Sequence, residues 1–235
     1  MVFGDPSFFP NTQQTSLKAS DSTSALPKRE LLKIIVLGSS NAGKTSIMKR
    51  YVGNDFDPRR RATVGADFMT KELKVGEDWV LLQVWDTAGQ ERFAHSTLGS
   101  GFYRGAAAAL LVYDLSDNHS FGQVAMWREE LLSRLPEKDA SDSFPVVVIG
   151  NKLDLVSPGR EAVDTEAVRH WCNTKGMGYL ETSAKDGTGV AAAMEACAVL
   201  ALQEKRRQIR ERADEGRLDL TLPTQRRQQE GQCCQ

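Results

Sequence analysis

The segment that most constrains the fold is GSSNAGKTS at positions 38–46, which follows a short apolar run and precedes a helical pattern. The apolar run, LLKIIVLG at 31–38, is rich in β-branched residues and ends in glycine, which predicts a buried strand. The loop has the spacing G-x-x-x-x-G-K-[ST], which is typical of phosphate-binding loops when it joins a strand to a helix. This context disfavours the plainer alternative of a glycine-rich turn with a surface lysine. The sequence therefore predicts a polyphosphate site at the end of a buried strand.

Each residue type in this loop has a chemical reason to be there. Backbone N–H groups of the loop and of the following helix N-terminus would point at phosphate oxygens. Glycines at 38 and 43 let the backbone wrap where a Cβ would obstruct it. Lys44 would place a point charge on the outer phosphates, and the Thr45 hydroxyl would bind Mg²⁺, a cation that prefers oxygen ligands. The predicted phosphate-binding residues here are Ser40, Asn41, Ala42, Gly43, Lys44, Thr45 and Ser46.

Strand and helix patterns alternate along the rest of the chain. Further strands are predicted at 67–75, 79–85, 106–114, 144–151 and 178–184, and helices at 44–53, 91–104, 119–135, 164–175 and 188–212. Such alternation implies βαβ units and a parallel sheet covered on both faces. Gly-Glu-Asp at 76–78 predicts a hairpin with a three-residue loop. We expect an α/β, three-layer P-loop NTPase fold, with a mostly parallel six-stranded sheet, one antiparallel strand and helices on both faces.

The two ends of the chain differ in composition from this central region. Residues 1–28 are rich in Pro, Ser, Thr, Asn and Gln and show little periodicity. Such a segment buries too little surface to offset the entropy lost on ordering. From about Ala213 polarity rises and periodicity fades. We expect a disordered N-terminal extension at 1–28, one domain at 29–212 and a flexible tail at 213–235.

Composition and charge exclude several functional classes. The net charge is -1, which gives no support to a general nucleic-acid binder. The longest apolar stretches fall far short of the ~18 residues that a membrane-spanning helix needs. The N-terminus lacks the basic start of a secretory signal, and the 4 cysteines are too scattered for a disulfide framework or a metal cluster. We expect a cytosol-facing protein in a reducing environment, without a transmembrane segment or a nucleic-acid partner.

The segment NKLD at 151–154 indicates which base is bound. It closes the predicted strand 144–151, and the Asp154 carboxylate would accept hydrogen bonds from the ring N–H and exocyclic amine of guanine, which adenine does not present. Hydrogen bonds to a charged group contribute roughly 1.5–3 kcal/mol each, which suffices for strong selection of guanine. Asn151 would brace the loop, and the stem of Lys152 would pack on the base.

A second segment, TSAKDG at 182–187, follows another predicted strand. The backbone N–H of Ala184 would donate to the guanine carbonyl. Alone, NKLD is also consistent with a turn and TSAK with a helix cap, but their order and their place at strand ends predict one guanine site. Its residues are Asn151, Lys152, Asp154, Ser183, Ala184 and Lys185.

The segment WDTAGQERF at 85–93 supplies groups for the metal and for the terminal phosphate. Asp86 would join the Mg²⁺ shell, the Gly89 N–H would contact a γ-phosphate, and Gln90 would orient the attacking water. For Gln90 alone, a solvated loop residue is the alternative. The Thr63 hydroxyl would reach Mg²⁺ if its loop folds over a triphosphate.

Together GSSNAGKTS, TVGADF, WDTAGQERF, NKLD and TSAK resemble a small GTPase of the Ras superfamily, specifically of the Rab family. The resemblance covers about residues 30–205. The segments ADFMTKEL, GFYRGA, FPVVVIGNKLDL and WCNTKGMGYLETSAK are similar to the late-endosomal and vacuolar Rab subgroup. By this resemblance Phe56 would stack edge-on against guanine, with an ordinary core phenylalanine as the alternative, and Thr63 and Asp86 would hold the metal.

The resemblance implies a GTP/GDP switch that hydrolyses GTP slowly with Mg²⁺ and regulates vesicle trafficking to the late endosome, vacuole or lysosome. A γ-phosphate would order two loops that hydrolysis releases. The implied partners are a guanine nucleotide exchange factor, a GTPase-activating protein, an escort protein or GDP dissociation inhibitor, and effectors. The activator would supply an arginine and in this family can also replace the role of Gln90. The implied place is the cytosolic face of these membranes, with a soluble cytosolic pool.

The chain ends QCCQ, which departs from the C-a-a-X prenylation rule because position 232 is Gln. Cys233 and Cys234 instead resemble the Rab double-cysteine tail, which carries two geranylgeranyl groups; a pair of exposed thiols is the alternative. One lipid chain binds membranes marginally, and two give stable anchoring. Nearby basic residues are interrupted by acids, so electrostatic attraction to the membrane would be auxiliary.

Three features depart from the family pattern. Asn41 stands where many relatives have a second loop glycine, and asparagine tolerates positive φ better than most residues. Arg60 replaces a frequent tyrosine, and the stretch 94–101 is two residues longer than expected. These departures leave open a Rab-like scaffold that holds GTP without hydrolysing it. An ATP-using P-loop kinase is a second alternative, which NKLD disfavours.

Overall fold

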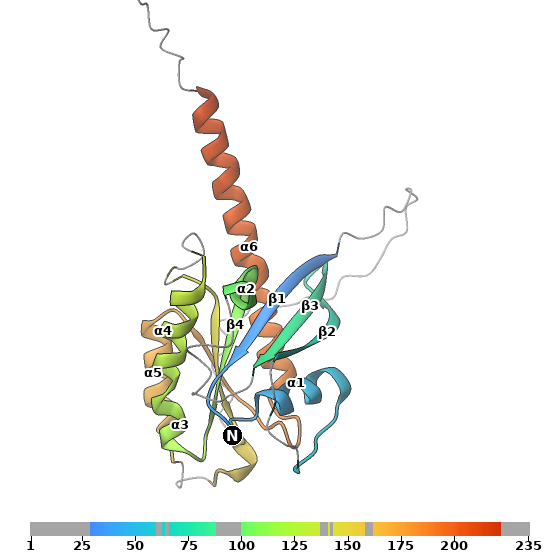
Figure 1. Ribbon diagram of the computed structural model, residues 1–235, viewed down its shortest axis with the longest axis vertical. Coiled ribbons are helices and arrows are strands. Elements are labelled where there is room, and N and C mark those ends of the chain that lie inside the picture. Colours follow the sequence, from blue (N-terminus) through green and yellow to red (C-terminus); the bar gives the residue numbers. More distant parts are fainter. Residues whose placement is uncertain are drawn as a thin grey trace, which may run out of the picture.

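The computed structural model describes residues 29–59, 63, 66–87, 100–136, 141, 143–157 and 162–221. Its centre is a six-stranded sheet in the order β2-β3-β1-β4-β5-β6 (Figure 1). β2 pairs antiparallel with β3, and the other neighbouring strands pair in parallel. The strands are β1 (Glu30–Leu37), β2 (Ala66–Val75), β3 (Asp78–Thr87), β4 (Ala106–Asp114), β5 (Val146–Asn151) and β6 (Gly178–Glu181).

Helices cover both faces of this sheet (Figure 1). The helices α1 (Lys44–Gly53) and α6 (Val190–Thr221) pack on one face. The other face carries α2 (Ser100–Tyr103), α3 (Asn118–Gly122), α4 (Val124–Arg134) and α5 (Thr165–Thr174), and a short 3₁₀ turn, η3 (Leu153–Leu155), follows β5. The expected three-layer α/β fold is confirmed.

Alternation of side chains along the strands builds two hydrophobic cores, one on each side of the sheet. On β1, Leu32 and Ile34 join the core under α1 and α6, whereas Ile35 joins the core on the opposite face, and all three are fully buried. Burying each such side chain contributes about 1.5–3 kcal/mol. A strand buried on both faces reads as an unbroken apolar run, which is why LLKIIVLG predicted it.

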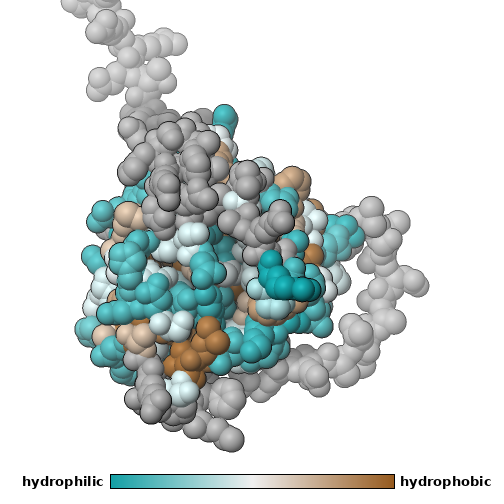
Figure 2. Space-filling view, turned by 60° about the horizontal axis from the view of Figure 1, so that its bottom comes forward, coloured by the Kyte–Doolittle hydropathy of each residue, from teal (hydrophilic) through white to brown (hydrophobic). Residues whose placement is uncertain are grey.

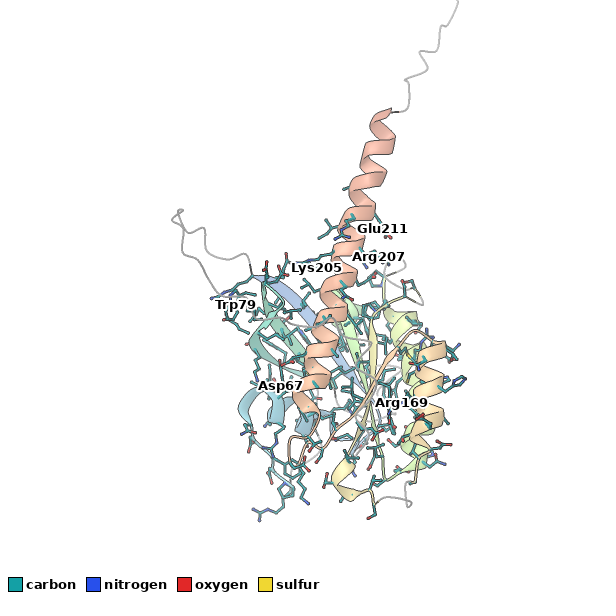
Figure 3. The ribbon with its side chains drawn as sticks, turned by 180° about the vertical axis from the view of Figure 1, so that it is seen from behind. Asp67, Trp79, Arg169, Lys205, Arg207 and Glu211 are labelled. Carbon is teal, nitrogen blue, oxygen red and sulfur yellow. The ribbon has the colours of Figure 1, made fainter. Side chains whose placement is uncertain are left out.

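Helix α6 is the main departure from the expected boundaries. We expected it to end at 212, but it continues to Thr221 and projects beyond the sheet (Figure 1). Where it leaves the sheet, Lys205 pairs with Glu30 at 2.7 Å, and Arg207 pairs with Glu211 at 2.6 Å (Figure 3). Pairs spaced i,i+4 stabilise a polar helix without leaving a hydrophobic pattern. Beyond 212 the sequence ADEGRLDLT has little hydrophobic periodicity, so a prediction from that pattern ended the helix too early.

Smaller differences concern two connections. The hairpin between β2 and β3 turns on two residues rather than three, because Val75 pairs directly with Asp78. The helix expected at 119–135 is divided into α3 and α4 around Gln123. Of the helix expected at 91–104, the structure describes only α2. Among the described helices, none combines the length and the apolar character needed to cross a membrane.

Candidate functional site

The predicted site residues that the structure describes gather where the parallel strands end, at the lower edge of the sheet in Figure 1. Ligands of open α/β sheets bind at this edge, outside the carboxyl ends of the strands. Figure 2 brings this end of the molecule forward and shows a largely hydrophilic surface with one hydrophobic patch. A polar face of this kind suits a charged ligand.

The loop after β1 is shaped by glycines that no other residue could replace without strain. Gly38 has φ +141°, and a Cβ there would lie 2.0 Å from the carbonyl oxygen of Val112. Gly43 has φ +92°, and its Cβ would lie 2.2 Å from Nδ2 of Asn151. Asn41 adopts φ +62°, which confirms that asparagine takes the left-handed conformation expected at this position.

Helix α1 begins directly after this loop and carries Lys44 at its first position. Gly43 is the N-cap and provides no side chain to cap the helix. Lys44 is 5% exposed, and its ammonium donates to the carbonyls of Gly38 at 2.7 Å and Ser39 at 2.9 Å. A helix N-terminus and a fixed positive charge thus occupy the same place, which favours an anion. Of the other predicted phosphate-binding residues, Ser40 is exposed, Ala42 buried and Ser46 half-buried.

The three predicted metal ligands come together beside this loop. Oγ1 of Thr45 donates to Oδ2 of Asp86 and lies 2.7 Å from Oγ1 of Thr63. Oγ1 of Thr63 is 3.5 Å from the same carboxylate oxygen, and Asp86 is 1% exposed. No group of three His, Cys, Asp or Glu gathers within the described residues. One carboxylate and two hydroxyls fit Mg²⁺, which commonly takes its remaining oxygens from phosphates and water.

Asn151 connects the phosphate loop to the base-side loops. It is 1% exposed, and its Nδ2 donates to the carbonyl of Ala42 at 2.8 Å. Its Oδ1 accepts from the Thr182 hydroxyl at 3.2 Å and from the Ala184 N–H at 3.1 Å. The predicted bracing role agrees with these contacts. The Ala184 N–H, which we expected to face the guanine carbonyl, thus has a partner within the protein.

Lys152 is held by a carboxylate at the end of β4. Its Nζ lies 2.7 Å from Oδ2 of Asp114, and its backbone adopts φ +66°. Burial alone would raise the pKa of Asp114, but hydrogen bonds from Lys152 and Ser116 outweigh burial and leave that pKa below its ordinary value. With its ammonium fixed in this way, the stem of Lys152 is the part available for packing on a base.

The Asp154 carboxylate is oriented by the neighbouring loop. Its Oδ1 accepts from the Ser183 hydroxyl at 2.7 Å, and its Oδ2 lies 3.5 Å from Nζ of Lys185. The two loops are joined further by the Leu153 N–H, which donates to the carbonyl of Thr182 at 3.0 Å. NKLD and TSAK are therefore joined in one structural unit, which a single guanine site would require.

Sequence reasoning missed one residue at this site. Arg50, on the last turn of α1, donates through Nε to the carbonyl of Ala184 at 2.8 Å and through an NH2 group to that of Lys185. Its guanidinium carbon lies 6.0 Å from the ring centroid of Phe56, which packs partly buried against the core. No motif includes Arg50, and these contacts span more than 130 residues. The stacking of Phe56 on guanine stays a prediction.

Several predicted residues lie outside the described part of the chain. They include Gly89 and Gln90, the lipidation candidates Cys233 and Cys234, the variant position Arg60, and most of the longer stretch at 94–101.

Comparison with known proteins gives a consistent result. The profile of the Ras family matches residues 33–203. Ras-related protein Rab7A of Mesembryanthemum crystallinum is 46% identical over 179 residues, which cover 76% of this chain and 85% of the relative. GTP-binding protein yptV5 of Volvox carteri is 48% identical over 167 residues (71% and 80%), and Ras-related protein Rab7 of Drosophila melanogaster is 46% identical over 177 residues (75% and 83%). The chain therefore belongs to the Ras family of small GTPases, which hydrolyse GTP to GDP, and within that family to the Rab proteins.

Proposed function

We propose that this protein is a Mg²⁺-dependent GTP/GDP switch that acts in vesicle trafficking to the late endosome, vacuole or lysosome. The observation that carries the proposal is the position of Asn151, which bonds the phosphate loop with its nitrogen and the base-side loop with its oxygen. A site for phosphates and a site for a purine are thereby held at a fixed separation, as one nucleotide requires.

At the phosphate end, the loop amides, the α1 N-terminus and Lys44 neutralise negative charge. Thr45, Thr63 and Asp86 would hold Mg²⁺, which would supply positive charge beside the phosphates. Thr63 comes from the segment before β2, so its position beside Thr45 connects that segment to the nucleotide end of the molecule. Release of this contact is how one switch segment would report the loss of a phosphate.

At the base end, the Asp154 carboxylate would recognise guanine by accepting hydrogen bonds from the two donors of the base, the ring N–H and the exocyclic amine. The Ser183 hydroxyl orients the carboxylate. Lys152 and Phe56 would flank the base. Adenine would leave the oriented carboxylate without a donor, so it is rejected by the cost of an unsatisfied charged group.

We assign to Gln90 the role of orienting the water that attacks GTP. Hydrolysis by the protein alone would be slow, and an activating protein that supplies an arginine would accelerate it. Two assays test this account. GTP and ATP are competed for the purified protein, and single-turnover hydrolysis of bound GTP is followed with and without a candidate activator. We expect GTP to win and hydrolysis to be slow but accelerated by the activator. Binding of ATP, or GTP that persists even with active activators, would contradict the proposal.

Partners that read the nucleotide state would use the exposed aromatic surface on β2 and β3. Phe68 is 50% exposed on the edge strand, and its ring stacks on Trp85 with centroids 5.2 Å apart. Trp85 meets Phe102 edge-on at 5.7 Å, and Phe102 lies in α2. We propose that this surface on β2 and β3 contacts the partners of the switch. These partners are effectors, the exchange factor, the activating protein and the escort protein or GDP dissociation inhibitor.

The compartment rests on relatives whose names include Rab7. We propose that Cys233 and Cys234 carry geranylgeranyl groups that anchor the protein to the cytosolic face of the membrane, with a soluble pool when the tail is bound by the escort or inhibitor protein. Replacing both cysteines with serine should move the protein to the soluble fraction of a cell lysate. Retention on membranes would point to a different anchor.

A further inference from the structure

We infer that Arg50 is a positioning residue that holds the guanine-binding loop against α1 and thereby sets how slowly the nucleotide leaves. This inference deepens the proposed function and rests on it. No motif marks Arg50, and no contact of its own with a ligand is needed.

The guanidinium of Arg50 donates four hydrogen bonds. Besides the carbonyls of Ala184 and Lys185, it donates through NH1 to the backbone carbonyl and to Oδ1 of Asn54, both at 2.9 Å. Phe56 lies over the guanidinium at 6.0 Å. Arginine presents five N–H donors on three nitrogens in a rigid planar fork, so it can bridge more acceptors, and acceptors further apart, than the single ammonium nitrogen of lysine can.

Arg50 donates to the carbonyls of Ala184 and Lys185, and these two residues contact the side chains proposed to position and recognise the base. Ala184 donates its N–H to Asn151, and Lys185 reaches Asp154. The loop has some internal support, because the Gly187 N–H donates to the carbonyl of Ser183 at 2.8 Å. Only Arg50, however, connects its outer carbonyls to the rest of the domain among the contacts described. Without Arg50, the contacts with Asn151 and Asp154 remain, but the loop loses its described hydrogen bonds to α1 and is held less firmly against the base.

Arg50 also joins the base end to the start of the first switch segment. Asn54, in the left-handed conformation at φ +51°, caps α1, and the chain continues through Phe56 toward Thr63. Figure 1 shows the end of α1 and the loop before α6 at the same end of the molecule. A partner that pulls residues 54–59 outward would break the hydrogen bonds between Arg50 and Asn54. The Arg50 side chain would then be less firmly placed against the carbonyls of Ala184 and Lys185, and the base loop would loosen. Arg50 thus couples the segment after α1 to the base loop, so a partner that moves this segment would accelerate nucleotide exchange.

The test measures dissociation of fluorescent GDP from the full chain. Arg50→Ala should speed dissociation by about tenfold to a hundredfold, the scale expected when charged hydrogen bonds are lost. Arg50→Lys, which keeps the charge and can satisfy only part of the acceptors, should give an intermediate rate. Lys49→Ala, on the same turn of α1, is the matched control and should release GDP at the wild-type rate.

A second readout separates positioning from general damage. Chelating Mg²⁺ speeds GDP release by weakening the phosphate end, and that fold-increase should be the same in wild type and in both Arg50 variants. A structural defect that reaches the phosphate loop would change it. If Arg50→Ala does not fold, Arg50→Lys carries the test with the same two measurements.

The outcomes separate this inference from the proposed function. If wild type fails to retain GDP at all, the proposed function is wrong. If wild type retains GDP but the Arg50 variants release it at the wild-type rate, or change the response to chelation, the role of Arg50 is wrong while the switch assignment stands.

Discussion

The phosphate end and the base end of the site are built in different ways. The proposed phosphate end comes mainly from one continuous stretch, 38–46, in which backbone conformation and the start of α1 would bind the phosphates. The base end is assembled from separate segments whose side chains hold one another's main chain, with Asn151 and Arg50 as the connecting residues. A substitution at the phosphate end should therefore cause a large loss of nucleotide affinity. A substitution at the base end should cause a smaller loss, because several contacts share the work of holding its loops.

The largest effect is expected from Gly43→Ala. The new Cβ would lie 2.2 Å from Nδ2 of Asn151 at φ +92°, so both the loop and its brace must move. Nucleotide affinity should fall by about a thousandfold or more, roughly 4 kcal/mol. Gly53→Ala, at the end of α1 with no atom within 4 Å of the added Cβ, is the control and should be neutral. Titration calorimetry with GDP decides, and normal affinity in the Gly43 variant would show that the loop does not bind phosphate.

The next effect concerns the base end alone. Asp154→Asn removes the acceptor pair for guanine and offers a donor that suits the 2-oxo group of xanthine. GDP affinity should fall by about a hundredfold to a thousandfold, with a matching preference for xanthosine diphosphate. Competition between the two diphosphates measures this. Unchanged selectivity would remove Asp154 from the guanine contact and leave the phosphate end untouched.

Thr45→Asn tests the metal side of the phosphate end. The Thr45 hydroxyl lies between Thr63 and Asp86, so a bulkier amide displaces the oxygens that would hold Mg²⁺. Affinity for GTP should fall relative to GDP by about tenfold to a hundredfold, the scale seen when groups around a metal are altered. Equal losses for both nucleotides would contradict the assigned role.

The smallest effect is expected at Lys152, and it should depend on pH. Because hydrogen bonds hold the folded-state pKa of Asp114 below its ordinary value of 3.8, their contribution is present above about pH 4 and is lost as pH falls through that lowered pKa. Lys152→Met should thus lower the free energy of unfolding by about 1–3 kcal/mol at pH 7. The difference from wild type should shrink below pH 4. Urea unfolding across this range measures it, with Lys175→Met, an exposed lysine, as the control; a constant difference would exclude the pairing as its cause.

The same contrast explains what the sequence could predict. The strand before the phosphate loop was predicted from its apolar run and is confirmed as β1. Thr45, Thr63 and Asp86 lie together, as one metal site requires, but the place of Thr63 was expected from the family resemblance and not from local spacing, and the binding roles stay predictions. The hydrogen bonds from Arg50 to the carbonyls of Ala184 and Lys185, and the ion pair between Lys152 and Asp114, were not predicted. These contacts depend on which segments, distant in sequence, meet in the fold. The extension of α6 to Thr221 was missed because the sequence from 213 to 221 carries little of the apolar periodicity from which helices were predicted.

The central claim is that one polyphosphate-binding loop and one oriented carboxylate together hold a guanine nucleotide. The most direct measurement is the identity and stoichiometry of the nucleotide released when the purified protein is denatured. The account predicts GDP or GTP at close to one molecule per chain. Recovery of protein without nucleotide, or carrying an adenine nucleotide, would contradict it.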